Sequence, residues 1–190
     1  MHAEAEACFI EAIRLQPDLS EARMNLGTLY IATGRFEEAA VLLEQVATDP
    51  LYHRPYRAFN NLGIVYSELG RNEDAITAYR QSLKLAPGFC QAHFNLAAVL
   101  QDEGRYPQAD KHIQEAANRC PEDGRFQLEY AAYLVREERG AEAIPILNAI
   151  SMADPMGDLG ERARELLQVL QGVILGVREG RGDPGKRGAS

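Results

Sequence analysis

The chain has 190 residues, a hydrophobic content of 46% and a net charge of −8 from 28 acidic and 20 basic residues. This is the composition of a globular chain with a sizeable core, and no run approaches the ~20 apolar residues of a membrane span. The opening MHAEAEACF has no basic stretch followed by an apolar run, so it is not expected to act as a signal peptide, and the absence of a Lys/Arg cluster argues against a nucleic-acid partner.

Taken in chain order, the predicted elements are all helices. A lone helix at 2–17 comes first, then four helical hairpins at 20–55, 56–89, 90–123 and 124–157, and a closing helix from about 158 to 176. In the hairpin at 56–89, Phe59, Leu62, Gly63 and Tyr66 have the spacing of one helical face. No segment shows strand-like alternation. The sequence therefore predicts an all-α fold.

The hairpins are copies of one another. The segments LGTLYIATGRFEEA, LGIVYSELGRNEDA, LAAVLQDEGRYPQA and YAAYLVREERGAEA begin at residues 26, 62, 96 and 130, and Pro87, Pro121 and Pro155 recur at intervals of 34 residues. The pattern resembles the tetratricopeptide repeat, a helix–turn–helix unit with a period of ~34 residues. The resemblance implies one α-solenoid domain at 1–176 that binds proteins. The glycine-rich remainder, 177–190, is expected to be a disordered tail.

No arrangement of residues predicts catalysis or a cofactor. None of the four histidines, at positions 2, 53, 93 and 112, stands in a nucleophile–base pattern. Cys90 and His93 share a predicted helix face and Cys120 could lie near them, but a fourth metal ligand is lacking, so a partly buried histidine is the preferred interpretation. The segment GRGDPGKR has the spacing of a phosphate loop up to its lysine, but Arg187 stands where Ser or Thr is required. We expect neither an enzyme nor a cofactor.

The first helices of the hairpins carry a column of asparagines. Asn25, Asn61 and Asn95 recur about one repeat apart on the expected inner surface, with Asn60 beside them. An amide offers donors and an acceptor to an extended peptide backbone, and some peptide-binding relatives carry similar columns. The apolar contacts would come from Met24, Phe94 and Leu128. The alternative is that the amides only bond neighbouring helices. Glu21 and Gln91 stand where carboxylate-clamping relatives carry basic residues, which disfavours a chaperone-tail partner.

One connection, DPLYHRP at 49–55, is longer than the others, because Gly27 and Gly63 are 36 residues apart. It is expected to place Tyr52 on the rim of the groove, as a further contact for the peptide. With GFCQAHFNLA at 88–97 and NRCPED at 118–123, the connection resembles the pilotin-like lipoproteins of type IV pilus assembly. That resemblance implies a periplasmic, outer-membrane-associated scaffold that binds secretin subunits. The alternatives are a cytoplasmic module of a larger enzyme, such as a repeat-containing glycosyltransferase, and a general adaptor.

The three cysteines indicate in which cellular compartment the protein resides. Cys90 opens one predicted helix and Cys120 ends the helix that returns beside it, so the two ends lie within plausible reach of a disulfide. Cys8 has no partner and is expected to be free. The alternative is a pair of buried thiols in a reducing compartment. Because stable disulfides are rare in the cytosol, a bridge favours the periplasmic interpretation.

The two ends of the helical array predict self-association. The lone helix at 2–17 lacks the helix that would cover Phe9 and Ile13, and the closing helix carries an apolar series, Leu166, Leu167, Leu170 and Ile174. Uncovered apolar faces of this size usually find a partner.

Overall fold

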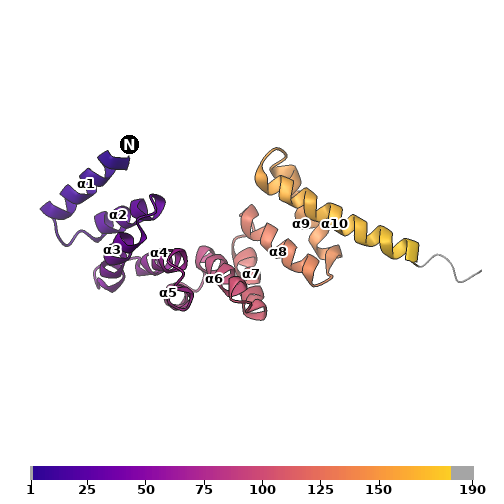
Figure 1. Ribbon diagram of the computed structural model, residues 1–190, viewed down its shortest axis with the longest axis horizontal. Helices are drawn as coiled ribbons and strands as arrows, with labels where there is room; N and C mark the ends of the chain where they lie inside the picture. Colours follow the sequence, from indigo (N-terminus) through magenta and orange to yellow (C-terminus); the bar gives the residue numbers. More distant parts are fainter. Residues whose placement is uncertain (1, 181–190) are drawn as a thin grey trace, which may run out of the picture. The chain divides into compact units, whose positions relative to one another are not determined.

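The computed structural model describes residues 2–180, and the side chains of residues 2–172. Within that range it consists of ten helices and no strand, so the all-α prediction is confirmed (Figure 1). The helices are α1 (His2–Leu15), α2 (Ser20–Ala32), α3 (Phe36–Thr48), α4 (Pro55–Glu68), α5 (Asn72–Leu85), α6 (Cys90–Asp102), α7 (Tyr106–Arg119), α8 (Gly124–Arg136), α9 (Gly140–Ala153) and α10 (Asp158–Gly180).

The turn inside each hairpin needs one residue in the left-handed region. Gly34, Gly70 and Gly104 take it in the first three hairpins, with φ of 74°, 70° and 69°. Glycine has no Cβ and pays little for this conformation, which is why it commonly ends helices. In the fourth hairpin Glu138 takes the same conformation at φ 58°. The turn is therefore fixed by the repeat as a whole and not by the glycine alone.

Small residues let the two helices of each hairpin cross closely. Ala39, Ala75, Ala109 and Ala143 recur at one position of the second helix, and all are fully buried. On the first helix, a Cβ added to Gly63 would lie 2.4 Å from Cε1 of Tyr79, and one added to Gly27 would lie 2.9 Å from Cγ of Leu43. These glycines are required because a large side chain of the partner helix fills the space above them.

The chain forms two compact units, one ending at Arg119 and the next beginning at Cys120. The sequence had indicated a single domain at 1–176. In unit 1 the helices of each hairpin pack together, and α4 also contacts α2 and α6, so that the first helices lie side by side. In unit 2, α10 packs against both α8 and α9. Leu43 and Val65 belong to the core of unit 1, and Leu128 and Leu147 to that of unit 2.

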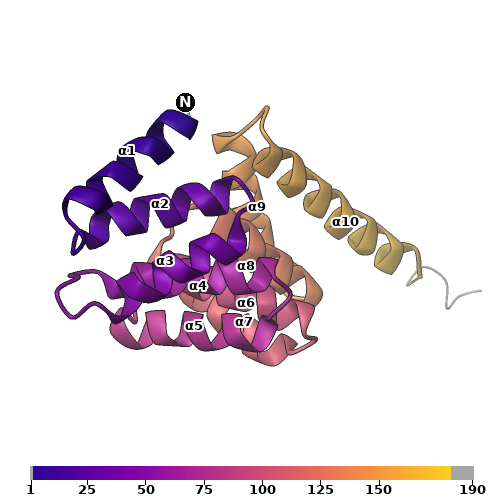
Figure 2. The same ribbon diagram turned by 60° about the vertical axis from the view of Figure 1, so that its left-hand side comes forward.

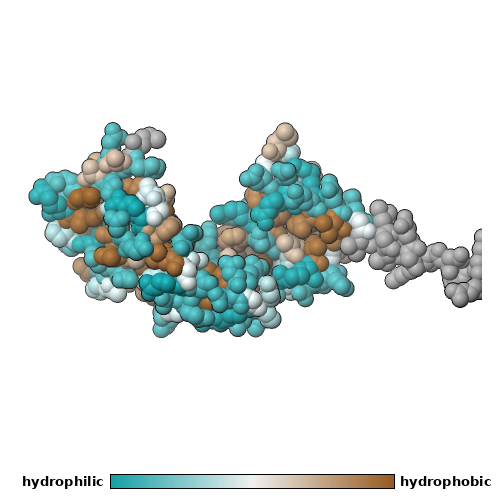
Figure 3. All heavy atoms as spheres, viewed as in Figure 1, coloured by the Kyte–Doolittle hydropathy of each residue, from teal (hydrophilic) through white to brown (hydrophobic). Residues whose placement is uncertain are grey.

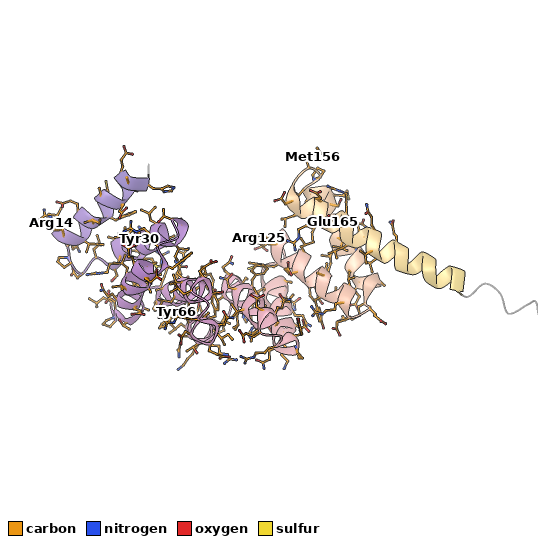
Figure 4. All side chains as sticks on the ribbon, in the orientation of Figure 1. Arg14, Tyr30, Tyr66, Arg125, Met156 and Glu165 are labelled. Carbon is orange, nitrogen blue, oxygen red and sulfur yellow. The ribbon has the colours of Figure 1, made fainter. Side chains whose placement is uncertain are left out.

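Helix α1 lies along α2 as the outermost helix of unit 1 (Figure 2). Phe9 and Ile13 are half-buried against the core, whereas Ile10 and Leu15 are 49% and 69% exposed. Apolar surface gathers over α1 to α3 in Figure 3. Tyr30, labelled in Figure 4, donates a hydrogen bond to Glu6 across the two helices. Phe9 and Ile13 are therefore partly covered, and the exposed apolar surface of α1 is that of Ile10 and Leu15 instead.

The closing helix differs from the expectation. Helix α10 continues to Gly180 instead of ending at 176, since no proline interrupts it before Pro184. Leu170 is buried, with its Cδ2 atom 2.6 Å from where a Cβ on Gly140 would lie, and Leu166 and Leu167 are half-buried. The predicted exposed apolar face is therefore wrong for these three leucines. The side chain of Ile174 and the tail at 181–190 lie outside the described residues.

Candidate functional site

A hollow of about 420 Å³ lies on unit 1, across the first helices of its hairpins. Residues of α2 and α4 form most of its lining, and the connections before α4 and α6 and the first turn of α6 complete it. The lining residues are Glu21, Met24, Asn25, Thr28, Tyr52, Arg57, Asn60, Asn61, Ile64, Phe89 and Gln91. Five of the predicted peptide contacts are among them: Met24, Asn25, Tyr52, Asn60 and Asn61.

A chain of side-chain amides crosses the hollow from α6 to α2. Gln91 donates to Asn95 at 2.8 Å, and Asn95 donates to Asn60 at 3.1 Å. Asn60 donates to Asn61 at 3.4 Å, and Asn61 donates to the hydroxyl of Thr28 at 3.2 Å. Asn61 and Asn95 of the predicted column thus link neighbouring helices, as the alternative interpretation required, whereas Asn25 takes no part in this chain. These bonds use one N–H group and one lone pair of each of Asn60, Asn61 and Asn95, and a side-chain amide has two of each, so these three asparagines can bond a further group.

The apolar contacts are placed differently from the prediction. Leu128 is 1% exposed and belongs to the core of unit 2, so its assignment as a groove contact is wrong. Its equivalents Met24 and Asn60 are also buried, at 8% and 4% exposure. This position, one residue before the asparagine column, faces the neighbouring helix. Phe94 and Asn95 are half-buried on α6.

Tyr52 lies under the hollow and not on its rim. It is 8% exposed, packs with the core of unit 1, and lines the hollow at the same time. Burial raises the pKa of its phenol. Asp49 holds the connection in place by accepting hydrogen bonds from the Ser20 hydroxyl and the Leu51 amide. The two extra residues therefore bring a core side chain to the site.

Sequence reasoning missed Phe89, which lines the hollow from the connection before α6 and meets Tyr56 edge-to-face at 5.0 Å between ring centroids. An apolar residue just before a predicted helix is a signal that could have found it. The charges at the hollow are few. Glu21 pairs with Arg54 at 3.0 Å, and Arg57 is exposed at the wall.

His93 has a partner that the sequence did not indicate. Its Nε2 donates to the Pro87 carbonyl at 3.0 Å, and its Nδ1 lies 2.9 Å from Nδ1 of His112. Because Nε2 carries the proton of neutral His93, the Nδ1 of His112 must be the donor between the two rings. Among the described residues no group of three or more His, Cys, Asp or Glu is placed to hold a metal ion.

The histidine pair makes stability depend on pH. Burial, then the neighbouring His93 and Arg80, lower the pKa of His112 to about 4. The unfolded chain therefore binds more protons below pH ~6.5, and unfolding free energy falls as pH falls from that value to about 4. We expect a loss of about 1–2 kcal/mol over this window, less than the full shift would give because solvent screens the half-buried His112, measured by urea unfolding at a series of pH values.

Matched variants separate this effect from other titrations. The H112Q variant is expected to lose less stability between pH 6.5 and 4.5 than the parent, whereas H53Q, at an exposed position, should follow the parent. Glu6 and Glu38 have a lowered pKa because they bond Arg35, so their contribution is lost only below pH ~4.5. Equal slopes for all three proteins above that value would contradict the assignment.

Cys90 and Cys120 are disulfide-bonded, and Cys8 is a free, exposed thiol. No helix in the described range has the length and apolar character needed to cross a membrane.

Comparison with known proteins agrees with the repeated hairpins. Models of the tetratricopeptide repeat match residues 1–50, 56–89 and 91–115, which together exceed half of the chain. The chain belongs to the tetratricopeptide repeat family. Members of this family generally serve as protein-binding modules. The matches leave out 51–55, within the longer connection that carries Tyr52.

Among curated proteins, this repeat protein is 28% identical over 164 residues to the peroxisomal targeting signal receptor of Candida glabrata, covering 86% of the chain and 25% of the receptor. It is 30% identical over 126 residues to the probable UDP-N-acetylglucosamine–peptide N-acetylglucosaminyltransferase SPINDLY of Hordeum vulgare, covering 62% of the chain and 13% of the transferase. The chain thus spans a quarter or less of these relatives.

Among solved structures, PilF of Pseudomonas aeruginosa is similar with a TM-score of 0.71 and 20% identity, covering 83% of this chain and 71% of PilF. PilW, a type IV pilus biogenesis factor, is similar with a TM-score of 0.68 and 22% identity, covering 80% and 70%. At these identities the likeness is one of fold.

Proposed function

We propose that the hollow of unit 1 binds an extended peptide segment of a partner protein. The observation that carries this proposal is the chain of amides across a hollow whose floor is apolar. An extended peptide presents alternating N–H and C=O groups, which side-chain amides can pair with in either direction. Met24, Tyr52 and Phe89 supply the apolar surface for its side chains.

Asn25 provides the cleanest test of the proposal. Its side chain is exposed, lines the hollow and forms no hydrogen bond within the described residues. The N25A change therefore removes a possible peptide contact without breaking a bond of the fold. The N61A/N95A double variant removes one further residue of the lining, Asn61, and interrupts the amide chain at both positions.

The probes are peptides selected on the wild-type chain from a random displayed library and measured by fluorescence anisotropy. We expect N25A to weaken binding about three- to ten-fold and N61A/N95A more, with unchanged helical circular dichroism, since one hydrogen bond contributes about 0.5–1.5 kcal/mol. The matched control is N118A/N148A, two exposed asparagines outside the hollow. Peptide affinities that change no more in N61A/N95A than in this control would place the binding site elsewhere.

We further propose a pilotin-like role, in which a periplasmic, outer-membrane-associated scaffold binds secretin subunits without catalysing a reaction. Two observations support it: the disulfide-bonded state of Cys90 and Cys120, which suits an oxidising compartment, and the long connection at 49–55. Pull-down of secretin subunits from cells that make type IV pili tests the role. Retention of a secretin by the wild-type chain and not by N61A/N95A is the expected result.

The rival candidate is a repeat region of a larger enzyme, and the similarity to part of an N-acetylglucosaminyltransferase favours it. The full-length gene product distinguishes the two. A lipoprotein signal would support the pilotin-like role, and a downstream catalytic domain would support the rival.

A further inference from the structure

The outer face of α9 is apolar where a surface helix is normally polar. Ala149 and Ala153 are exposed there, and Met152 is 82% exposed. At the repeat positions of Ala149 and Met152 the second helices of the three earlier hairpins carry polar residues, whereas at the position of Ala153 helix α5 carries the exposed Leu85. The polar residues are Gln45, Gln81 and Glu115 for Ala149, and Thr48, Lys84 and Asn118 for Met152. The difference is confined to unit 2, which points to a covered surface there.

Ala149 and Ala153 of this face line a hollow of about 570 Å³, here called the α9 groove. The start of α8, the second half of α9 and the start of α10 form it, and every lining residue belongs to unit 2. Its apolar lining includes Pro121, Pro145, Ile146, Ala149 and Leu159. Helix α9 begins at Gly140 and contains Pro145, which lies in the groove wall.

The rim of the α9 groove is acidic. Glu122 and Asp154 line it, and Asp158 and Glu161 stand in the first turn of α10. None of the four forms an ion pair among the described residues. Neighbouring arginines of unit 2 are engaged with other groups: Arg139 with Glu142, Arg162 with Glu129 and Arg164 with the Pro155 carbonyl. The groove therefore suits a segment that is apolar on one side and carries cations beside it.

The chain itself contains such a segment at 173–187, VILGVREGRGDPGKR. Its apolar Val173, Ile174 and Val177 have the spacing of one helical face, and the backbone of 173–180 is helical. The cations that follow are Arg178, Arg181, Lys186 and Arg187. We propose that the α9 groove binds residues 173–187 of a second copy of this chain.

The geometry of α10 favours a second copy over the same chain. Val173 is 15 residues beyond Asp158, which at 1.5 Å per residue is about 22 Å along the helix from the groove. An intact α10 cannot return its own segment to that place. Two copies with antiparallel α10 helices place each segment in the groove of the other at once. The result is a closed, two-fold dimer in which both copies use the same surfaces.

The test measures the mass of the full chain by light scattering over a range of concentrations. We expect a dimer, at twice the chain mass of 21.0 kDa. The A149R variant puts a bulky cation into the groove at an exposed position and is expected to raise the dimer dissociation constant at least ten-fold. The matched control is A141R, which makes the same change at an exposed position of α9 outside the groove.

A second arm tests the occupant. The I174E variant is expected to weaken the dimer as A149R does, and an excess of a synthetic peptide of residues 173–190 is expected to dissociate wild-type dimers. The same peptide with Arg178 and Arg181 changed to Glu should be at least ten-fold less effective, because the acidic rim repels it. A monomeric wild-type chain at high concentration would overturn the proposal, and so would a dimer unaffected by A149R and I174E. Dimerisation through the half-covered face of α1 would give the latter result.

Discussion

Replacing Cys90 and Cys120 by Ser is expected to lower the free energy of unfolding by about 3–4 kcal/mol, measured by urea denaturation under non-reducing conditions. A disulfide restricts the unfolded chain, and in the chain-entropy model the gain for a loop of about 30 residues has this size. In the folded protein Cys90 is 6% exposed, so the serine hydroxyl adds a small desolvation cost at that position.

Thiol counting provides the direct measurement. The denatured, unreduced protein is expected to show one free thiol, that of the exposed Cys8. The C8S variant serves as the control and should show none, with unchanged stability. A count of three in wild type would contradict the bridge, and with it the main support for an oxidising compartment and the pilotin-like role. That result would not bear on the proposal that the hollow of unit 1 binds a peptide.

The L43A variant is expected to lose about 2–5 kcal/mol of unfolding free energy, the range for removing a fully buried leucine. Leu43 has no exposed surface and fills the space above Gly27, where α2 and α3 approach each other closely. The helices cannot collapse much further around the cavity, because the backbone of α2 already touches this side chain. Urea unfolding followed by circular dichroism provides the measurement.

The control for L43A is L85A, the same substitution at a residue of α5 that is 51% exposed. It is expected to cost less than about 1 kcal/mol, because most of that side chain already meets water. Similar losses in the two variants would mean that Leu43 is not packed as described.

The periodicity of the sequence was sufficient to predict the hairpins. Residues such as Ala75 and Gly63 are small because a helix crosses there, and that requirement recurs every 34 residues wherever the repeat is regular. The same periodicity placed Asn25 and Asn61 on one surface. It could not show that the position of Leu128, one residue before the asparagine position, is buried between helices. Adjacent residues of a helix point in different directions, so a side chain between helices can stand next to one on the surface.

Contacts that break the repeat were not predictable in this way. His112 pairs with His93 through a bond across two helices, and neither residue has a counterpart in the other hairpins. The division of the chain at Arg119 and Cys120 also leaves no mark in the spacing, because Pro121 keeps the regular interval. Local sequence patterns determine which helices form. The histidine pair and the division into two units depend instead on contacts between side chains that are far apart in the sequence.

Tyr52 contributes both to the stability of the fold and to the lining of the hollow of unit 1. In most repeat proteins a connection between hairpins can vary without cost, because loops carry little of the core. Here the connection supplies a side chain that is both core and floor of the hollow. A substitution at Tyr52 cannot tune the affinity for a partner without also changing stability, so adaptation to a new partner is easier through Asn25 or Arg57 at the exposed wall.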